Sequence, residues 1–203
     1  MLRLIASLTT VLLHAGIATG QSAPSSWLDG PLSNWNKPGA SVPAAPASSE
    51  SRTAMIERCQ LSPRQTTAPE KALAAAGWLP YLHFDRQLLQ GDIEIVDGMV
   101  AADGMCRPGS FNGFVFVGGR FAGTLSPEPM TSRLDGSIGA IRIVSSDVIT
   151  AEFARYRATD PLCCPSSRVM VEFRINRTGP SPIVTPREIK TSRSNSGASG
   201  PDR

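Results

Sequence analysis

Apolar and polar residues alternate with a period of two through most of the second half of the chain, the pattern of β-strands with one buried face. The clearest run is residues 169–176, where four apolar positions alternate with Met170 and three polar side chains. Shorter runs of similar character bring the number of candidate strands to about seven, at 78–85, 93–95, 114–117, 120–122, 141–143, 149–154 and 169–176.

Glycine-containing pairs separate several of these runs. Gly118-Gly119 lies between residues 114–117 and 120–122 and suits a two-residue hairpin turn, because both positions of such a turn take positive φ. Asp-Gly pairs at 97–98, 103–104 and 135–136 predict further turns. Short turns between successive strands favour an antiparallel β-meander.

One helix is predicted ahead of these strands. Thr67 is a suitable N-cap, Pro69 falls in the first turn and Glu70 complements the positive end of the helix. Residues 71–76 are strong helix formers, and Gly77 is a natural stop. The predicted fold class is therefore α+β, with one N-terminal helix packed on one face of the meander and the other face partly solvated.

The first 20 residues have the organisation of a signal peptide. Arg3 precedes an apolar run over residues 4–17, and Ala18-Thr19-Gly20 provides small residues for cleavage before Gln21. The run is shorter than the roughly 20 apolar residues that span a bilayer, and no other run approaches that length. The sequence predicts a protein of the periplasm or the medium, without a transmembrane segment in the mature chain.

Composition divides the rest of the chain into three parts. Residues 21–56 are rich in Pro, Ser and Ala and predict a linker, although we expect Trp27 and Trp35 to dock on the folded domain. Residues 57–185 form the predicted domain, and residues 186–203 a disordered tail.

All four cysteines, Cys59, Cys106, Cys163 and Cys164, follow the predicted cleavage site, which in an exported chain indicates a disulfide-stapled domain. Neighbouring residues lie about 3.8 Å apart at Cα, less than a disulfide normally spans, so a bond between Cys163 and Cys164 is disfavoured. Two pairings are left open, in which Cys163 and Cys164 bond separately to Cys59 and Cys106. Zinc binding and redox chemistry at the adjacent pair are less favoured, since the chain has no C-x-x-C motif.

Catalytic chemistry has little support in the sequence. His83 is the only histidine after the leader, it lies in a candidate strand, and no G-x-S-x-G motif accompanies it. The acids at 85, 92, 94, 97 and 103 could suggest paired carboxylates or a calcium site, but they lack the alternating spacing of a calcium loop. The formal net charge of +3 comes from scattered arginines and does not indicate nucleic-acid binding. We therefore predict no catalytic residues, no metal site and no cofactor.

Two stretches resemble a known family. Residues 116–125, together with Tyr156 and the segment Asp160-Pro-Leu-Cys-Cys-Pro-Ser166, are similar to the LppP/LprE lipoproteins, exported proteins of the bacterial cell envelope. The resemblance covers roughly residues 70–176 and implies an envelope address and a cysteine-bearing β domain, but no reaction. This chain has Gln21 where a lipoprotein carries its lipidated cysteine, so a lipid anchor is not implied.

Two classes of function follow. The first is a non-catalytic, monomeric envelope or secreted protein that binds a protein or a small ligand through its loops and exposed sheet face. The alternatives are a small-ligand or lipid carrier, because β layers can enclose apolar pockets, and a redox protein that uses Cys163 and Cys164.

Overall fold

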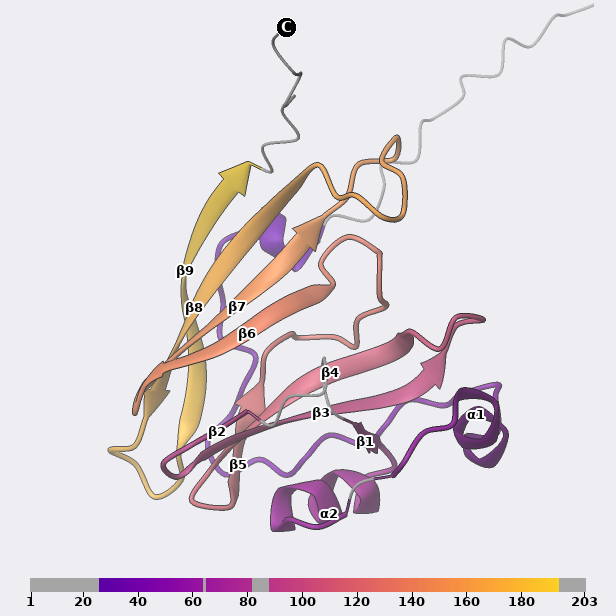
Figure 1. The fold of residues 1–203 in the computed structure, drawn as a ribbon. Helices are drawn as coiled ribbons and strands as arrows, with labels where there is room; N and C mark the ends of the chain where they lie inside the picture. The colour runs from indigo at the N-terminus through magenta and orange to yellow at the C-terminus, as the bar shows by residue number, and fades with distance from the viewer. Residues whose placement is uncertain (1–25, 64, 82–87, 194–203) are drawn as a thin grey trace, which may run out of the picture.

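The protein is mostly β, with two antiparallel sheets and two α-helices (Figure 1). The computed structural model describes residues 26–63, 65–81 and 88–193. The predicted leader, its cleavage site and His83 lie outside the described residues. No helix among the described residues is long and apolar enough to cross a membrane.

The first sheet contains five strands, β1 (Leu79–Tyr81), β2 (Leu88–Gln90), β3 (Ile93–Ala102), β4 (Pro108–Val117) and β5 (Arg120–Thr124). Strands β3, β4 and β5 pair in sequence order. Both β1 and β2 pair with the free edge of β3, and they do so along different parts of it: Leu79 lies opposite Met99, and Leu88 opposite Ile95.

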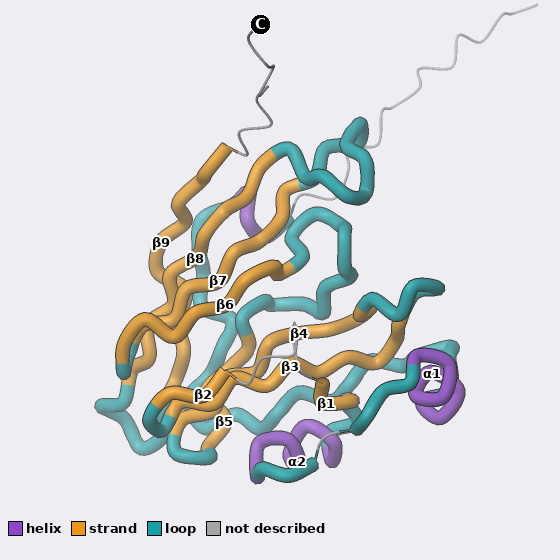
Figure 2. Tube along the Cα trace, viewed as in Figure 1, coloured by secondary structure: helices purple, strands orange, loops and turns teal. Residues whose placement is uncertain are grey.

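The second sheet is a four-stranded meander of β6 (Ile138–Ser145), β7 (Val148–Arg155), β8 (Ser167–Asn176) and β9 (Ile183–Arg193). It stacks on the first sheet, and helix α2 (Ala68–Ala75) covers the opposite face of the first sheet (Figures 1 and 2). Helix α1 (Arg52–Cys59) and a short 3₁₀ helix, η1 (Trp27–Asp29), complete the described elements.

The prediction of one meander of about seven strands with one helix is therefore correct only in its antiparallel, mostly β character. An eight-residue helix covers a small part of the apolar face that alternating strands create, so a second sheet has to cover the rest. The main core lies between the sheets and includes Met99, Phe111, Phe153 and Phe173. Phe173 is fully buried, as expected for the inward face of 169–176. The solvated face belongs to the second sheet rather than the first.

A smaller core lies between the first sheet and α2, where Leu73 packs with Trp78, Phe114 and Phe116. The predicted helix cap is confirmed. Thr67 Oγ1 accepts a hydrogen bond from the Glu70 backbone N–H at 3.2 Å, and Glu70 Oε2 accepts one from the Thr67 N–H at 3.1 Å. These reciprocal bonds satisfy donors that would be left without partners in the first helical turn.

The turn predictions succeed at three of four places. Gly118 and Gly119 join β4 to β5 with φ of 56° and 74°, and the pairs at 103–104 and 135–136 lie in turns. The pair Asp97-Gly98 instead lies inside β3. A Cβ added at Gly98 would approach the Leu73 side chain to 2.9 Å, so this glycine lets α2 pack closely on the sheet.

The N-terminal segment docks on the domain, as predicted. The Trp27 ring meets Phe153 edge to face at 5.2 Å, and the Trp35 ring meets Phe173 at 6.3 Å. The segment is less irregular than the linker prediction for 21–56 implies, because α1 begins at Arg52 and buries Met55 in the main core.

Residues 186–193 were assigned by their sequence to the disordered tail, and in the structure they belong to β9. Pro186 weakens the strand pattern of this segment. The structure accommodates the proline because β9 is an edge strand, paired with β8 alone, and its register shifts beside Phe173, the partner of Pro186.

The predicted disulfide pairing is wrong. Cys59, at the end of α1, bonds to Cys106, at the tip of the β3–β4 hairpin, with their Cα atoms 5.4 Å apart. Cys163 and Cys164 bond to each other in the β7–β8 loop, although their Cα atoms are only 3.8 Å apart. The fold places this loop at the end of the second sheet, away from α1 (Figure 1). Cys163 and Cys164 are therefore far from Cys59, one of the two partners that the sequence analysis considered for them.

Candidate binding cleft

A cleft of about 540 Å³ opens between the two sheets at one end of the molecule. Its interior is apolar, with Met99 from β3, Ile138 from β6 and Leu61 from the segment after α1. Three loops reach its mouth: the β3–β4 loop (103–107), the end of the β5–β6 loop (131–137) and the β7–β8 loop (156–166).

Strand β1 contributes Tyr81 to the lining of the cleft. The facing edges of the sheets make contact where β2 lies beside β6, and further along the same edge Met99 of β3 and Ile138 of β6 line the cleft. The Cys59–Cys106 disulfide fixes one wall by joining α1 to the hairpin tip beside Arg107 and Pro108.

Tyr81 provides a polar group within this apolar lining. Its hydroxyl oxygen is buried and forms no hydrogen bond with any described residue. Burial, and to a lesser extent the Asp97 carboxylate, raise the pKa of Tyr81 well above its usual value. A buried hydroxyl without a partner is unfavourable by about 1–3 kcal/mol, and a ligand that accepted its proton in a hydrogen bond would recover that free energy.

Asp97 lies beside Tyr81 in the β1–β3 ladder and is itself buried. Burial raises the pKa of Asp97 to about 8. The side chain is therefore a neutral carboxylic acid at pH 7, and this part of the interior carries no negative charge.

The charged groups that line the cleft all have the same sign. Arg107, Arg133 and Arg168 reach it, and its described lining contains no Asp or Glu. Arg107 is paired with Asp103, with Nε 2.6 Å from Oδ2, and Arg168 with Glu152 at the same distance. Arg133 makes no hydrogen bond or ion pair through its guanidinium with the described residues, and its backbone φ is 63°.

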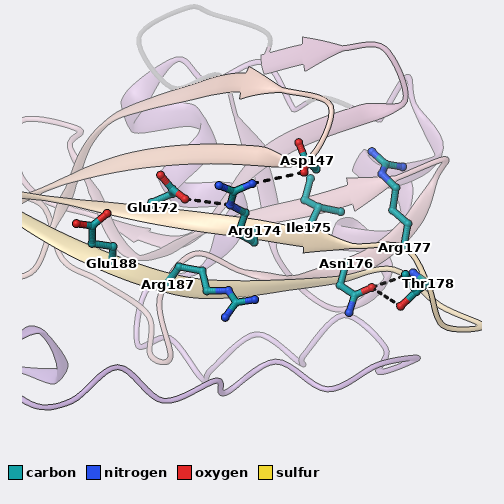
Figure 3. A pocket seen from close by; sticks show the side chains of 9 residues that line it. All are labelled: Asp147, Glu172, Arg174, Ile175, Asn176, Arg177, Thr178, Arg187 and Glu188. Atoms are coloured by element: carbon teal, nitrogen blue, oxygen red, sulfur yellow. Dashed lines mark hydrogen bonds and ion pairs between the residues drawn. The ribbon is translucent and has the colours of Figure 1, made fainter.

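A larger hollow on the outer face of the second sheet differs in charge. It measures about 740 Å³ and is lined by three arginines and three acids, Arg174, Arg177, Arg187, Asp147, Glu172 and Glu188. Figure 3 shows Arg174 between Glu172 and Asp147, with which it forms ion pairs at 3.0 and 3.6 Å. Arg177 pairs with Asp92 at 2.6 Å. The balanced charges are those of a solvated sheet face.

The structure separates the cysteines that the sequence singled out. The Cys59–Cys106 disulfide belongs to the cleft wall, whereas Cys163 and Cys164 are exposed in the β7–β8 loop. A hydrogen bond connects that loop to the cleft, because Tyr156 lines the cleft and its hydroxyl donates to the Leu162 carbonyl at 3.0 Å. The acids at 92, 97 and 103 lie apart from one another. Asp92 pairs with Arg177, Asp97 is buried in the core, and Asp103 pairs with Arg107.

Sequence reasoning singled out Cys106 and Tyr156 but missed the other residues that line the cleft. Tyr81, Arg107, Arg133 and Arg168 are far apart in the chain and share no motif. The alternation in 169–176 places Arg168 on the outer side of its strand, so it gave no indication that this residue lines a cleft.

The fold and the cleft together define a class: a two-sheet antiparallel β protein with a disulfide at the wall of a cationic, apolar cleft. The family model of the LppP/LprE lipoproteins matches residues 95–178, which confirms the resemblance seen in the sequence. The matched residues run from β3 to the end of β8, and the match indicates an envelope-associated protein of unknown role. No curated protein and no solved structure matches this chain.

Proposed function

We propose that this chain is an exported, non-catalytic envelope protein that binds a small amphipathic anion in the cleft between its sheets. The observation that carries the proposal is the lining, which combines an apolar interior with three arginines and contains no acid among its described residues. Such a lining favours a carboxylate or phosphate group attached to an apolar body, because the arginines would be poorly matched by a neutral or cationic molecule.

The size of the cleft supports a small molecule. Pockets for small ligands typically measure about 300–1,000 Å³ and combine an apolar lining with a few polar groups that fix orientation. Here the apolar body would contact Met99 and Ile138, the Tyr81 hydroxyl would donate to a polar atom, and Arg133 would face the anionic group at the mouth.

Binding without a reaction is favoured by the kinds of side chain present. The described lining offers the hydroxyls of Ser132, Ser137 and two tyrosines, but no imidazole or carboxylate that could serve as a general base beside them. Export is supported by the predicted leader, by the disulfides and by the family match. A soluble periplasmic or secreted form without a lipid anchor is the part of the proposal that depends on Gln21.

The test compares two ligands that share a decyl chain and differ in the headgroup, an anionic phosphate in one and a neutral hydroxyl in the other. We expect decyl phosphate to bind more tightly than decanol in a calorimetric titration. The variant Arg133→Gln should weaken binding of decyl phosphate about ten-fold, because it removes a charge-assisted hydrogen bond. Its affinity for decanol should stay unchanged.

Arg187→Gln is the matched control, since this arginine lies in the charge-balanced hollow on the outer sheet face. It should leave both affinities unchanged. Equal binding of the two ligands by the unmodified protein, or equal effects of the two arginine substitutions, would contradict the proposal.

The Cys163–Cys164 disulfide favours a second candidate, a redox protein that exchanges with an external dithiol. In that reaction the disulfide accepts two electrons and two protons and becomes two thiols, while the external dithiol becomes a disulfide. Both cysteines are exposed, which such an exchange requires. Mild dithiothreitol should release two thiols at 163 and 164 while the half-buried Cys59–Cys106 bond survives, and simultaneous reduction of both bonds would contradict this candidate.

A further inference from the structure

Exposed apolar side chains lie in the loops that contribute residues to the cleft. Each of the three loops that surround it presents one large apolar residue to solvent: Met105 is 73% exposed, Leu134 51% and Leu162 57%. Each lies next to the cleft lining. Met105 precedes Cys106, Leu134 follows Arg133, and Leu162 accepts the hydrogen bond from Tyr156.

The three loops lie at the same end of the molecule, on the right in Figure 1, and Figure 2 shows them in teal beyond the ends of the strands. The cleft confirms that they are neighbours, because residues from all three loops line it. The other large apolar residues that the structure exposes, Leu89, Val144 and Met170, lie in β2, β6 and β8, and none of them lines the cleft.

In the β3–β4 and β7–β8 loops, a polar side chain holds the loop in place and leaves the apolar tip outside. Asp103 accepts hydrogen bonds from the backbone N–H groups of Met105 and Arg107 at 2.9 and 3.0 Å. In the β7–β8 loop, Asp160 accepts from the N–H groups of Arg157 and Ser166, both at 2.8 Å. The apolar tips are therefore presented by ordered loops, and exposure of three such side chains is unfavourable unless something covers them.

Two of the three acids of these loops are paired with arginines, from the same loop or from the end of β7. Asp103 pairs with Arg107, and Asp135 with Arg155 at 2.9 Å. The backbone bond from Arg157, followed by the Ser166 hydroxyl, lowers the pKa of Asp160 and keeps it ionised within its own loop. Arg133 remains as a cation that no described acid matches, beside the exposed Leu134.

We propose that this end of the molecule docks on an anionic lipid bilayer, with Met105, Leu134 and Leu162 entering the interfacial region and Arg133 facing lipid phosphates. A fluid, anionic bilayer surface can accommodate three separate apolar side chains and attracts the arginine between them. Proteins bind at membrane surfaces by such partial insertion of apolar side chains beside basic ones. Docking in this orientation would place the mouth of the cleft against the lipid. The inference rests on the proposed function in so far as the bilayer would be the source or the destination of the bound amphiphile.

The test uses the purified exported chain and vesicles of phosphatidylglycerol and phosphatidylethanolamine in a co-sedimentation assay. The variant Met105→Ser/Leu134→Ser/Leu162→Ser should lower the partition coefficient at least about ten-fold, because three apolar side chains no longer leave water. The matched control is Leu89→Ser/Val144→Ser/Met170→Ser, which removes three exposed apolar side chains elsewhere, and it should bind as the unmodified protein does. Vesicles without phosphatidylglycerol should bind less.

Three outcomes would overturn the inference: no binding to the vesicles, equal loss in both triple variants, or full binding by the loop variant. A change of oligomeric state confined to the loop variant, with no vesicle binding by the unmodified chain, would mean that a second copy covers these tips.

The same two variants separate this inference from the proposed function. Titration with decyl phosphate in solution should give the loop variant an unchanged affinity, because none of its three altered residues lines the cleft. Loss of vesicle binding with retained ligand binding supports docking through the loops. Vesicle binding through the loops by a protein that does not bind decyl phosphate would retain the docking surface and reject the cleft as an anion site.

Discussion

The two stacked sheets meet along one lateral edge and leave a cleft along the other. Along one edge, where β5 lies beside β9, Asn36 from the N-terminal segment bridges the two sheets: its Nδ2 donates to the carbonyls of Thr124 and Val184, both at 3.0 Å. Its Oδ1 accepts from the Thr124 N–H at 2.9 Å, and the Trp35 indole donates to Thr124 Oγ1 at 3.1 Å.

Along the other edge lies the cleft, to which β1 contributes Tyr81. There the buried Tyr81 hydroxyl has no hydrogen-bond partner among the described residues, and Arg133 has no acid. At the closed edge polar groups meet other polar groups of the protein, so their role is structural. At the open edge the Tyr81 hydroxyl and the Arg133 guanidinium line an apolar space without such partners among the described residues, which is the arrangement expected where a ligand supplies them.

The largest expected effect is a pH dependence of the unfolding free energy, and it comes from Asp97, beside the open edge. The pKa of Asp97, near Tyr81, is raised from 3.8 to about 8 in the folded protein, so between these pH values the folded protein holds a proton that the unfolded chain has released. The proton held by Asp97 therefore stabilises the folded protein fully below about pH 4, and this stabilisation is lost as the pH rises to 8. The resulting decrease in the unfolding free energy has an upper bound on the order of 5 kcal/mol.

Asp97→Asn should remove this dependence, because the amide has a similar shape and does not ionise. Urea denaturation at pH 4.5 and pH 8 would measure the difference, and the variant should gain on the unmodified protein as the pH rises. Parallel pH profiles of the two proteins would show that Asp97 does not have the raised pKa.

The disulfide at the open edge should have the next largest effect. Cys59 and Cys106 are 47 residues apart, and loss of that cross-link through Cys106→Ser should lower the free energy of unfolding by about 4 kcal/mol. The double variant Cys163→Ser/Cys164→Ser opens a bond between neighbours, which restricts the unfolded chain far less, and should lose about 1 kcal/mol or less. Chemical denaturation would measure both values. Similar losses would contradict the assignment of the structural role to Cys59–Cys106.

The closed edge should show a smaller effect, confined to stability. Asn36→Ala removes the hydrogen bonds of Asn36 with the Thr124 N–H and with the carbonyls of Thr124 and Val184, at a cost of about 2 kcal/mol in unfolding free energy. The Thr124 carbonyl keeps the hydrogen bond from the Trp35 indole at 3.2 Å. Binding of decyl phosphate should stay unchanged, because Asn36 does not line the cleft. A weakened affinity with unchanged stability would show that the comparison between the edges assigns the roles wrongly.

Local rules predicted much of the secondary structure. The cap formed by Thr67 and Glu70, the Gly118-Gly119 turn and the inward face of 169–176 each depend on neighbours in the sequence, and each was found where expected. The predictions failed where distant residues decide. Gly98 looked like a turn residue because the approach of α2 is invisible in the chain, and β9 looked like a tail because its proline is acceptable only at a sheet edge.

The sequence by itself determined a cysteine-bearing β domain that is similar to the LppP/LprE lipoproteins over residues 95–178, with α2 and most of its strands, because alternation and caps act over a few residues. Only the tertiary structure decided that there are two sheets, that Cys59 bonds to Cys106, and that Tyr81, Arg107, Arg133 and Arg168 line one cleft. These outcomes depend on which apolar faces cover one another, and that choice is made by the burial of the whole chain rather than by any one segment.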